Sequence, residues 1–360
     1  VYYHLFFKAF QPGSMMDVRS RTISDADRRV GDRIAGLSED EIGFIRPATL
    51  EQDGKSLEFE VQGTILKVPL AKPIKPGKST TLVMDYTAQV PLQIRRSGRN
   101  NREGIDLSMT QWYPKLCNYD EDGWHPNPYI GREFYPIWGD YYVKITIDKS
   151  YILGGTGYIQ NNNEVGYGYE DEGVDFDHSD KEKLTWHFEA PNVHDFMWAA
   201  DPEYAHFSVD VEDGPRLHFL FKGEDSTMVQ NWYNLSEYTV RALEYANERY
   251  GEYPYDQYSV IQGGDGGMEY PMGTLITGRR QFGSLVGVTV HELMHSWYQA
   301  VLATHELLHP WMDEGFTTYT SAYVMDHLFP EDVDDALEKL QRSYASYFSI
   351  AGTEDENPLT

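Results

Sequence analysis

The segment from Ser284 to Phe316 constrains this chain most strongly, because a pair of histidines recurs in it at helical spacing. His291, Glu292 and His295 follow the arrangement H-E-x-x-H, which places both imidazoles on one face of a helix, where they can bind a single zinc ion. A catalytic zinc ion usually has three protein ligands and leaves a fourth position for water. Eighteen residues separate His295 from Glu314, which opens a second helix-like stretch. Glu314 is therefore a candidate for the third ligand.

The same arrangement occurs a second time, as H-E-L-L-H in residues 305–309. The first copy follows an apolar run from Leu285 to Val290, as expected of a buried active-site helix. Pro310 directly follows the second copy and disfavours a helix there. An equal spacing beyond the second copy reaches Leu328, which cannot bind a metal. We interpret the second copy, made of His305, Glu306 and His309, as a chance match on the protein surface.

Composition narrows the class of protein further. The chain has 360 residues, enough for about two domains, and 30 basic against 57 acidic residues give a net charge of −27. Such a surface repels nucleic acid and anionic membranes, so neither is expected as a partner. No apolar run approaches the roughly 18 residues of a membrane span. Cys117 is the single cysteine, which excludes an internal disulfide and a thiolate zinc cluster.

The pattern of residues changes near Phe207. Before it, short segments rich in β-branched and aromatic residues alternate with turn signals, which predicts a largely antiparallel β unit. After it, residues 226–250 carry apolar side chains at helical spacing and end at Gly251. A strand-like run over 259–262, a glycine-rich segment over 263–273 and the metal helix come next, and a further helix is predicted around 333–340.

Several of these features together resemble one known family. H-E-L-M-H, eighteen residues and then a glutamate within W-M-D-E-G-F, preceded by G-G-M-E-Y, are similar to the motifs of the zinc aminopeptidases that include aminopeptidase N and leukotriene hydrolase. The resemblance implies an α+β multidomain fold, with a saddle-like antiparallel β domain over residues 1–205 and a thermolysin-like α/β zinc catalytic domain over 206–360. It also implies a helical part beyond residue 360, so the sequence reads as an interrupted chain.

The resemblance assigns roles to individual residues. One zinc ion is expected on His291, His295 and Glu314, and Glu292 is expected to polarise the attacking water and relay its proton to the leaving amine. The glycine-rich turn is expected to bind the substrate, with Glu269 on the free α-amino group and the backbone on the peptide: Gly266, Gly267 and Met268.

Three departures from the family pattern concern substrate binding and catalysis. Tyr270 replaces the asparagine that ends the upstream motif. Family members often place a second amine-binding Glu or Gln two residues after a Thr-Gln pair, and here Tyr113 occupies that position, so we expect help from Gln111 or from the Tyr113 hydroxyl. The tyrosine that stabilises the oxyanion in the family is expected beyond residue 360, because Tyr344 and Tyr347 follow Glu314 too closely.

The sequence thus predicts a zinc-dependent aminopeptidase acting on peptides with a free N-terminus. Two alternatives stay open: a zinc endopeptidase or dipeptide-releasing peptidase, and a peptide-binding relative that has lost catalysis. Substrate side-chain preference and oligomeric state are not readable from the sequence. The compartment also stays open, with an extracytoplasmic location, periplasmic or secreted, favoured over a cytoplasmic one.

Overall fold

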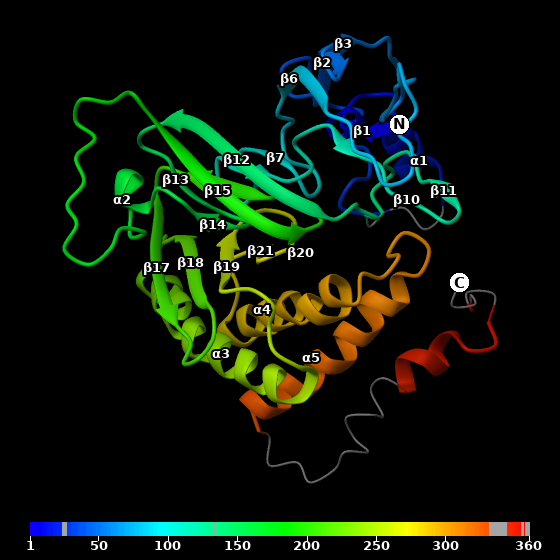
Figure 1. Cartoon of the computed structure of the whole chain (residues 1–360). Coiled ribbons are helices and arrows are strands. Elements are labelled where there is room, and N and C mark those ends of the chain that lie inside the picture. The colour runs from blue at the N-terminus through cyan, green and yellow to red at the C-terminus, as the bar shows by residue number, and fades with distance from the viewer. Residues whose placement is uncertain (24–26, 133, 331–343, 354–355, 357–360) are drawn as a thin grey trace.

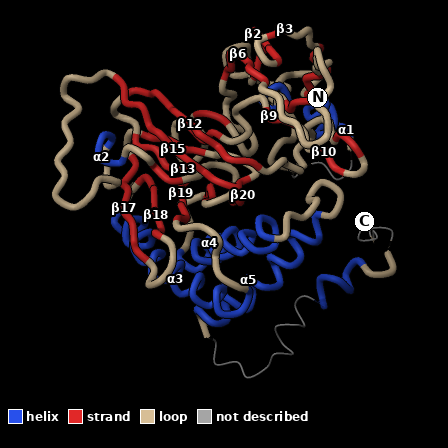
Figure 2. The backbone as a smooth tube through the Cα atoms, in the orientation of Figure 1, coloured by secondary structure: helices blue, strands red, loops and turns tan. Residues whose placement is uncertain are grey.

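The α+β class is confirmed by the computed structural model, which describes residues 1–23, 27–132, 134–330, 344–353 and 356. Figure 1 shows a strand-rich upper part, formed by the first half of the chain, above a lower part in which helices pack beneath a second group of strands. Figure 2 shows the same division between strands and helices along the backbone. The helix predicted around 333–340 lies outside the described residues.

The N-terminal half consists of small sheets whose strands pair antiparallel. Two of them have the orders β4-β5-β1-β9 and β3-β2-β6. Their strands are β1 Tyr2–His4, β2 Phe44–Gln52, β3 Lys55–Ser56, β4 Glu60–Gln62, β5 Ile65–Lys67, β6 Leu82–Gln89 and β9 Lys115–Leu116. Short helical segments lie beside them, namely η1 Phe6–Ala9 and α1 Met15–Thr22.

The same half contains a long antiparallel strand pair. β12 (Gly139–Asp148) pairs along its length with β15 (Lys183–Val193), with a bulge between Gly139 and Tyr141. The remaining sheets have the orders β12-β15-β14, β13-β16-β8-β7 and β10-β11. Their other strands are β7 Gly98–Arg99, β8 Leu107–Met109, β10 Tyr119–Asp120, β11 Gly123–Trp124, β13 Ile152–Gly155, β14 Tyr158–Ile159 and β16 Trp198–Asp201, with helix α2 at Asn162–Val165.

A five-stranded sheet of order β17-β18-β19-β21-β20 begins the second half. The inner strands β18, β19 and β21 are parallel, and β17 and β20 add antiparallel edges. Its strands are β17 Tyr204–Asp210, β18 Arg216–Lys222, β19 Gln257–Gln262, β20 Gly267–Tyr270 and β21 Gly273–Ile276. Three helices pack under it in Figure 1, α3 Ser226–Tyr250, α4 Phe282–His295 and α5 Phe316–Leu328. The predicted domain boundary between residues 205 and 206 stays a prediction.

Helix α3 shows why this half folds as it does. Its observed span, Ser226–Tyr250, is the predicted one, and the Asp225 side chain caps its start by accepting a 2.9 Å hydrogen bond from the Met228 amide. The apolar stripe of α3 is buried, and Trp232 stacks on Phe221 of β18 with ring centroids 5.1 Å apart. The helix therefore holds the sheet that carries the glycine-rich turn.

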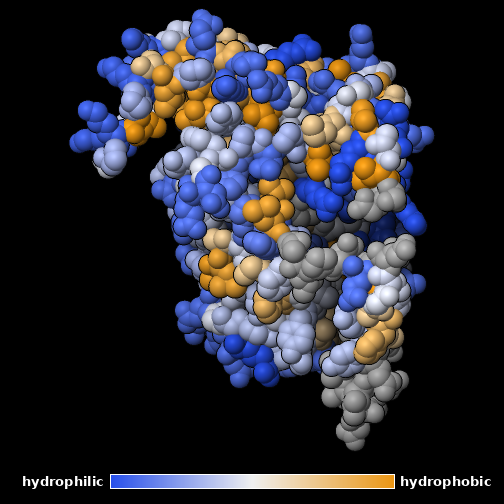
Figure 3. Space-filling view, turned by 90° about the vertical axis from the view of Figure 1, so that its right-hand side faces the viewer, coloured by the Kyte–Doolittle hydropathy of each residue, from blue (hydrophilic) through white to orange (hydrophobic). Residues whose placement is uncertain are grey.

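The surface of the protein is rich in polar residues, as the many charged residues of the sequence predict. On the face shown in Figure 3, polar residues surround small apolar groups. Within the part of the chain that the structure describes, no helix combines the length and apolar character needed to cross a bilayer. Cys117, the single cysteine, is buried.

Candidate zinc site

Helix α4 places the first pair of histidines as predicted. Buried Leu285, Val286 and Val290 anchor its inner face, and His291 and His295 project one turn apart. Their Nε2 atoms are 3.3 Å apart, and their ring planes are nearly perpendicular, with centroids 4.9 Å apart and an angle of 86°. The two imidazoles thus converge on one point in front of the helix.

Glu314 reaches the same point from the second helical segment. Its Oε2 atom lies 3.2 Å from His291 Nε2 and 3.8 Å from His295 Nε2. A tetrahedral zinc ion with bonds of about 2.0–2.1 Å separates its ligand atoms by roughly 3.3 Å. Two of the three separations match that value and the third is longer, so the spacing of these three donors fits a zinc ion.

Two π-helical segments flank this site. η2 (Ser296–Val301) continues directly from His295, and η3 (Trp311–Gly315) carries Glu314 immediately before α5. π-helical turns are rare in proteins, but those that occur are often found at functional sites. The wider turn changes the directions in which the side chains point. Two consecutive carboxylates of η3, those of Asp313 and Glu314, both reach His295, and Glu314 also lies beside His291.

Asp313 orients His295 from behind. Its Oδ1 atom lies 2.5 Å from His295 Nδ1, both side chains are almost fully buried, and Thr317 Oγ1 lies 3.3 Å from the same nitrogen. A hydrogen bond from Nδ1–H to this carboxylate leaves Nε2 with its lone pair, as metal binding requires. The sequence reasoning did not single out Asp313, although it stands directly before the predicted ligand.

We expect the substitution Asp313→Asn to weaken zinc binding at this site by about 10- to 100-fold, because the orienting carboxylate is lost while the ligands remain. Competition with a metal-sensitive dye measures this affinity, and added zinc should restore activity. The exposed Asp256→Asn is a control for removal of a charge. Unchanged zinc affinity in Asp313→Asn would contradict the orienting role.

Glu292 lies between the ligands and the glycine-rich turn. It is only 5% exposed, and burial raises its pKa above the ordinary value, although His295 and His291 act in the opposite direction. A Cβ atom at Gly267 would collide with Glu292 Oε1, which explains why the chain has glycine at that position. A carboxylate with a raised pKa suits a group that must accept a proton near neutral pH.

The turn itself is held on both sides. Gly266 has a positive φ of 94°, and its carbonyl accepts hydrogen bonds from the Thr277 amide and hydroxyl at 2.6 and 3.1 Å. Arg96 Nη1 donates to the Gly267 carbonyl at 3.1 Å. β20 is the edge strand of its sheet, so the backbone after Gly266 borders the site. Met268, also predicted to bind substrate, is buried within this strand.

Glu269 points from β20 toward the histidines. It is 6% exposed, and one of its carboxylate oxygens lies within 4.8 Å of ligand atoms of both Glu292 and His295. The structure therefore brings Glu269 together with the four side chains that the sequence placed at one site, namely His291, Glu292, His295 and Glu314. Their roles stay predictions.

Gln111 and Tyr113 lie in a buried network beside this turn. The Tyr270 hydroxyl donates to Gln111 Oε1 at 3.2 Å, and Gln111 Nε2 donates to Asp195 Oδ2 at 3.1 Å. The Tyr113 hydroxyl donates to Asp195 Oδ1 at 3.0 Å, and Lys115 Nζ lies 2.6 Å from Asp195 Oδ2. The amide of Gln111 is thus engaged at both ends, and its predicted contact with substrate stays a prediction.

Asp195 and Lys115 have no motif that would reveal them in the sequence. Both are almost completely buried. Burial acts to raise the pKa of Asp195, but the charge and hydrogen bond of Lys115, together with His194 and the Phe196 amide, lower that pKa overall. The pair ties β9, which carries Lys115, to the segment after β15, which carries Asp195. It fixes Tyr270 next to Glu269 through Gln111.

The second H-E-x-x-H copy requires a correction. Residues 305–309 form a turn rather than a helix, as the following proline predicts, but the copy is not a surface match throughout. Glu306 is 3% exposed, and one of its carboxylate oxygens lies within 4.8 Å of oxygens of Glu269 and Asp313. Of the two histidines of this copy, His309 is the exposed one. Sequence spacing could not reveal the burial, because it depends on how the connection between η2 and η3 folds back.

Comparison with known proteins agrees with this geometry. Residues 234–360 match the profile of the Peptidase family M1 domain, whereas no curated protein sequence matches the chain. A mutant M1 zinc metallopeptidase from Deinococcus radiodurans superposes with a TM-score of 0.60 at 17% identity, covering 88% of this chain and 67% of that one. A mutant two-domain M1 zinc metallopeptidase bound to L-arginine gives 0.57 at 16% identity, covering 85% and 65%.

A third structure is a Deinococcus radiodurans M1 zinc metallopeptidase mutant bound to a Tyr-Ser-Ala substrate, with a TM-score of 0.55 at 16% identity and coverage of 85% and 66%. At such identities the likeness shows the fold. The present chain spans about two thirds of the length of these structures.

Proposed function

We propose that this chain, whose residues 234–360 match the Peptidase family M1 domain, is a zinc aminopeptidase that removes residues from the free N-terminus of peptides. The observation that carries the proposal is the position of Glu269, a buried carboxylate on the edge strand β20 within 4.8 Å of Glu292 and His295. A carboxylate so close to the reacting groups leaves room for an α-amino group and little substrate beyond it. Cleavage would then occur after the first residue.

His291, His295 and Glu314 would hold a single zinc ion, since their donor atoms converge at separations suited to a tetrahedral site. When bound, zinc supplies Lewis acidity that brings the pKa of water toward neutrality. Asp313 keeps the proton of His295 on Nδ1, away from the metal.

Glu292 is the group in this chain that can move protons during the reaction. Its carboxylate accepts a proton from the attacking water and then donates it to the nitrogen of the leaving peptide, so the carboxylate is regenerated. Gly267 beside it has no side chain, which leaves the space that the Glu292 carboxylate occupies next to β20. The edge strand offers backbone groups that pair with an extended substrate.

Glu269 would hold the substrate ammonium group in a charge-assisted hydrogen bond. We expect Glu269→Gln to lower kcat/KM for peptides with a free N-terminus by about 10- to 150-fold, since such bonds contribute about 1.5–3 kcal/mol. Any slow cleavage of an N-acetylated peptide should not change. Steady-state kinetics on matched peptides measure both, and Glu252→Gln, at an exposed glutamate, is the control. An equal loss for both peptides would contradict amine recognition by Glu269.

A further inference from the structure

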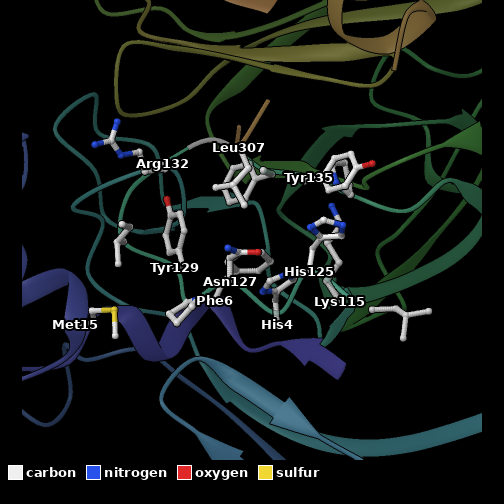
Figure 4. A pocket seen from close by; sticks show the side chains of 15 residues that line it. His4, Phe6, Met15, Lys115, His125, Asn127, Tyr129, Arg132, Tyr135 and Leu307 are labelled. Carbon is white, nitrogen blue, oxygen red and sulfur yellow. The ribbon is translucent and has the colours of Figure 1, made fainter. Parts of the chain in front are cut away.

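Three metal-binding side chains meet outside the candidate catalytic site. Asp120 lies on β10, His125 follows β11, and His305 lies in the connection between η2 and η3. One ligand atom from each is within 4.8 Å of the others. Figure 1 shows the orange connection that follows α4 extending toward β10, so the cluster joins two segments that are far apart in the sequence. His125 also lines a cavity of about 180 Å³, shown in Figure 4 with Tyr135 and Leu307 nearby.

The histidines of this cluster are arranged like those of the catalytic site. The rings of His125 and His305 have centroids 5.2 Å apart at an angle of 82°, compared with 4.9 Å and 86° for His291 and His295. Asp120 Oδ1 lies 2.7 Å from His125 Nε2. Two imidazoles and a carboxylate are the same donor types as those of the catalytic site. At 2.7 Å the Asp120 and His125 donor atoms are closer than the roughly 3.3 Å between ligands of one tetrahedral zinc ion, so a metal would take the place of the hydrogen bond between them.

Neighbouring groups hold the donors in place. The Tyr135 hydroxyl donates a 2.9 Å hydrogen bond to Asp120 Oδ2, and the Tyr135 ring stacks on His305 with centroids 3.5 Å apart. One oxygen of Asp120 is thus oriented by a tyrosine while the other faces the histidine, the kind of outer hydrogen bond that accompanies metal ligands.

One polar atom of the cluster is left without a hydrogen-bond partner among the described residues. His305 Nε2 is buried, while Nδ1 receives only a 3.3 Å contact from the Leu308 amide. A metal on Nε2 would satisfy this nitrogen, at the expense of that weak contact, because Nδ1 would then carry the proton.

We propose that Asp120, His125 and His305 form a second metal site, which binds a first-row divalent cation of the zinc type. Imidazole nitrogens select such ions over magnesium and calcium, which prefer oxygen ligands. The site ties the β10–β11 hairpin to the connection that carries buried Glu306 and leads to Glu314. It therefore restrains the segment between the second and third catalytic ligands.

Metal stoichiometry tests this inference on tag-free protein loaded with zinc and then dialysed. Elemental analysis should give two zinc ions per wild-type chain and one in His125→Ala or His305→Ala. His309→Ala, at the exposed histidine of the same loop, should keep two. A His305→Ala variant that retains as much zinc as the wild type would overturn the second site.

A double variant, His291→Ala with His295→Ala, separates this site from the catalytic one. This double variant should retain one zinc ion, and zinc should raise its melting temperature. The further substitution Asp120→Asn should abolish both effects, while the melting temperature without metal stays the same. If the double variant binds no zinc, the second site is refuted while the catalytic site stands. If wild type binds one zinc and the double variant keeps it, the catalytic assignment fails instead and the second site is supported.

Discussion

Replacing Glu292 by glutamine is expected to lower kcat/KM by about 100- to 10,000-fold, the range that a positioned proton-transfer group contributes. The amide keeps the size of the side chain but cannot accept the proton of the attacking water. Zinc content should stay the same, because Glu292 is not among the ligands whose donor atoms converge. Steady-state kinetics on an aminoacyl reporter, with elemental analysis of the same sample, measure both quantities.

The stability of this variant provides its control. Glu292 is buried and its pKa is raised by burial, so the ionised carboxylate is not favoured by its surroundings. A neutral amide should leave the melting temperature unchanged or raise it, which shows that lost activity does not result from unfolding. Full activity in a folded, zinc-loaded Glu292→Gln protein would refute its role as the base.

Removing the third ligand should abolish activity by a different route. Glu314→Ala leaves His291 and His295 as the remaining ligands. Loss of a hydrogen bond to a ligand lowers metal affinity by about 10- to 100-fold, and we expect the loss of a ligand itself to lower zinc affinity further. Activity should fall to background at nanomolar free zinc. Wild-type protein treated with a chelator should lose activity too.

Addition of zinc distinguishes the loss of a ligand in Glu314→Ala from the removal of metal by the chelator. The chelated wild type should recover fully, because its ligands are intact, whereas Glu314→Ala should recover little. Glu252→Gln is the matched control, because it removes an exposed carboxylate outside the site. Leu328→Ala would not serve, because Leu328 is buried. Zinc-dependent recovery of Glu314→Ala at wild-type zinc levels would show that Glu314 is not a ligand.

Local patterns predicted the parts of the fold that depend on neighbours in the chain. The span of α3 followed from its apolar spacing and from Gly251, and the convergence of His291 and His295 followed from helical geometry. The position of Glu314 required more, namely a connection that returns to the same helix. The eighteen-residue spacing made Glu314 a candidate, the family resemblance supported that expectation, and the structure places Glu314 beside both histidines.

Contacts between distant segments were not predictable in this way. Asp195 lies 80 residues from Lys115, and Gln111 lies 159 residues from Tyr270, so no periodicity connects either pair. The second H-E-x-x-H copy also shows that a local pattern does not predict contacts between distant segments. Proline correctly argued against a helix there, but the burial of Glu306 depends on the folding of a connection whose residues have no repeating pattern.

Cleavage after the first residue is the central claim, and product masses test it most directly. Two peptides of identical sequence, one with a free and one with an acetylated N-terminus, are incubated with the purified protein and followed by mass spectrometry. We predict a ladder in which the free peptide loses one residue at a time, while the acetylated peptide stays intact. Internal fragments, released dipeptides, or equal cleavage of both peptides would contradict the assignment as an aminopeptidase.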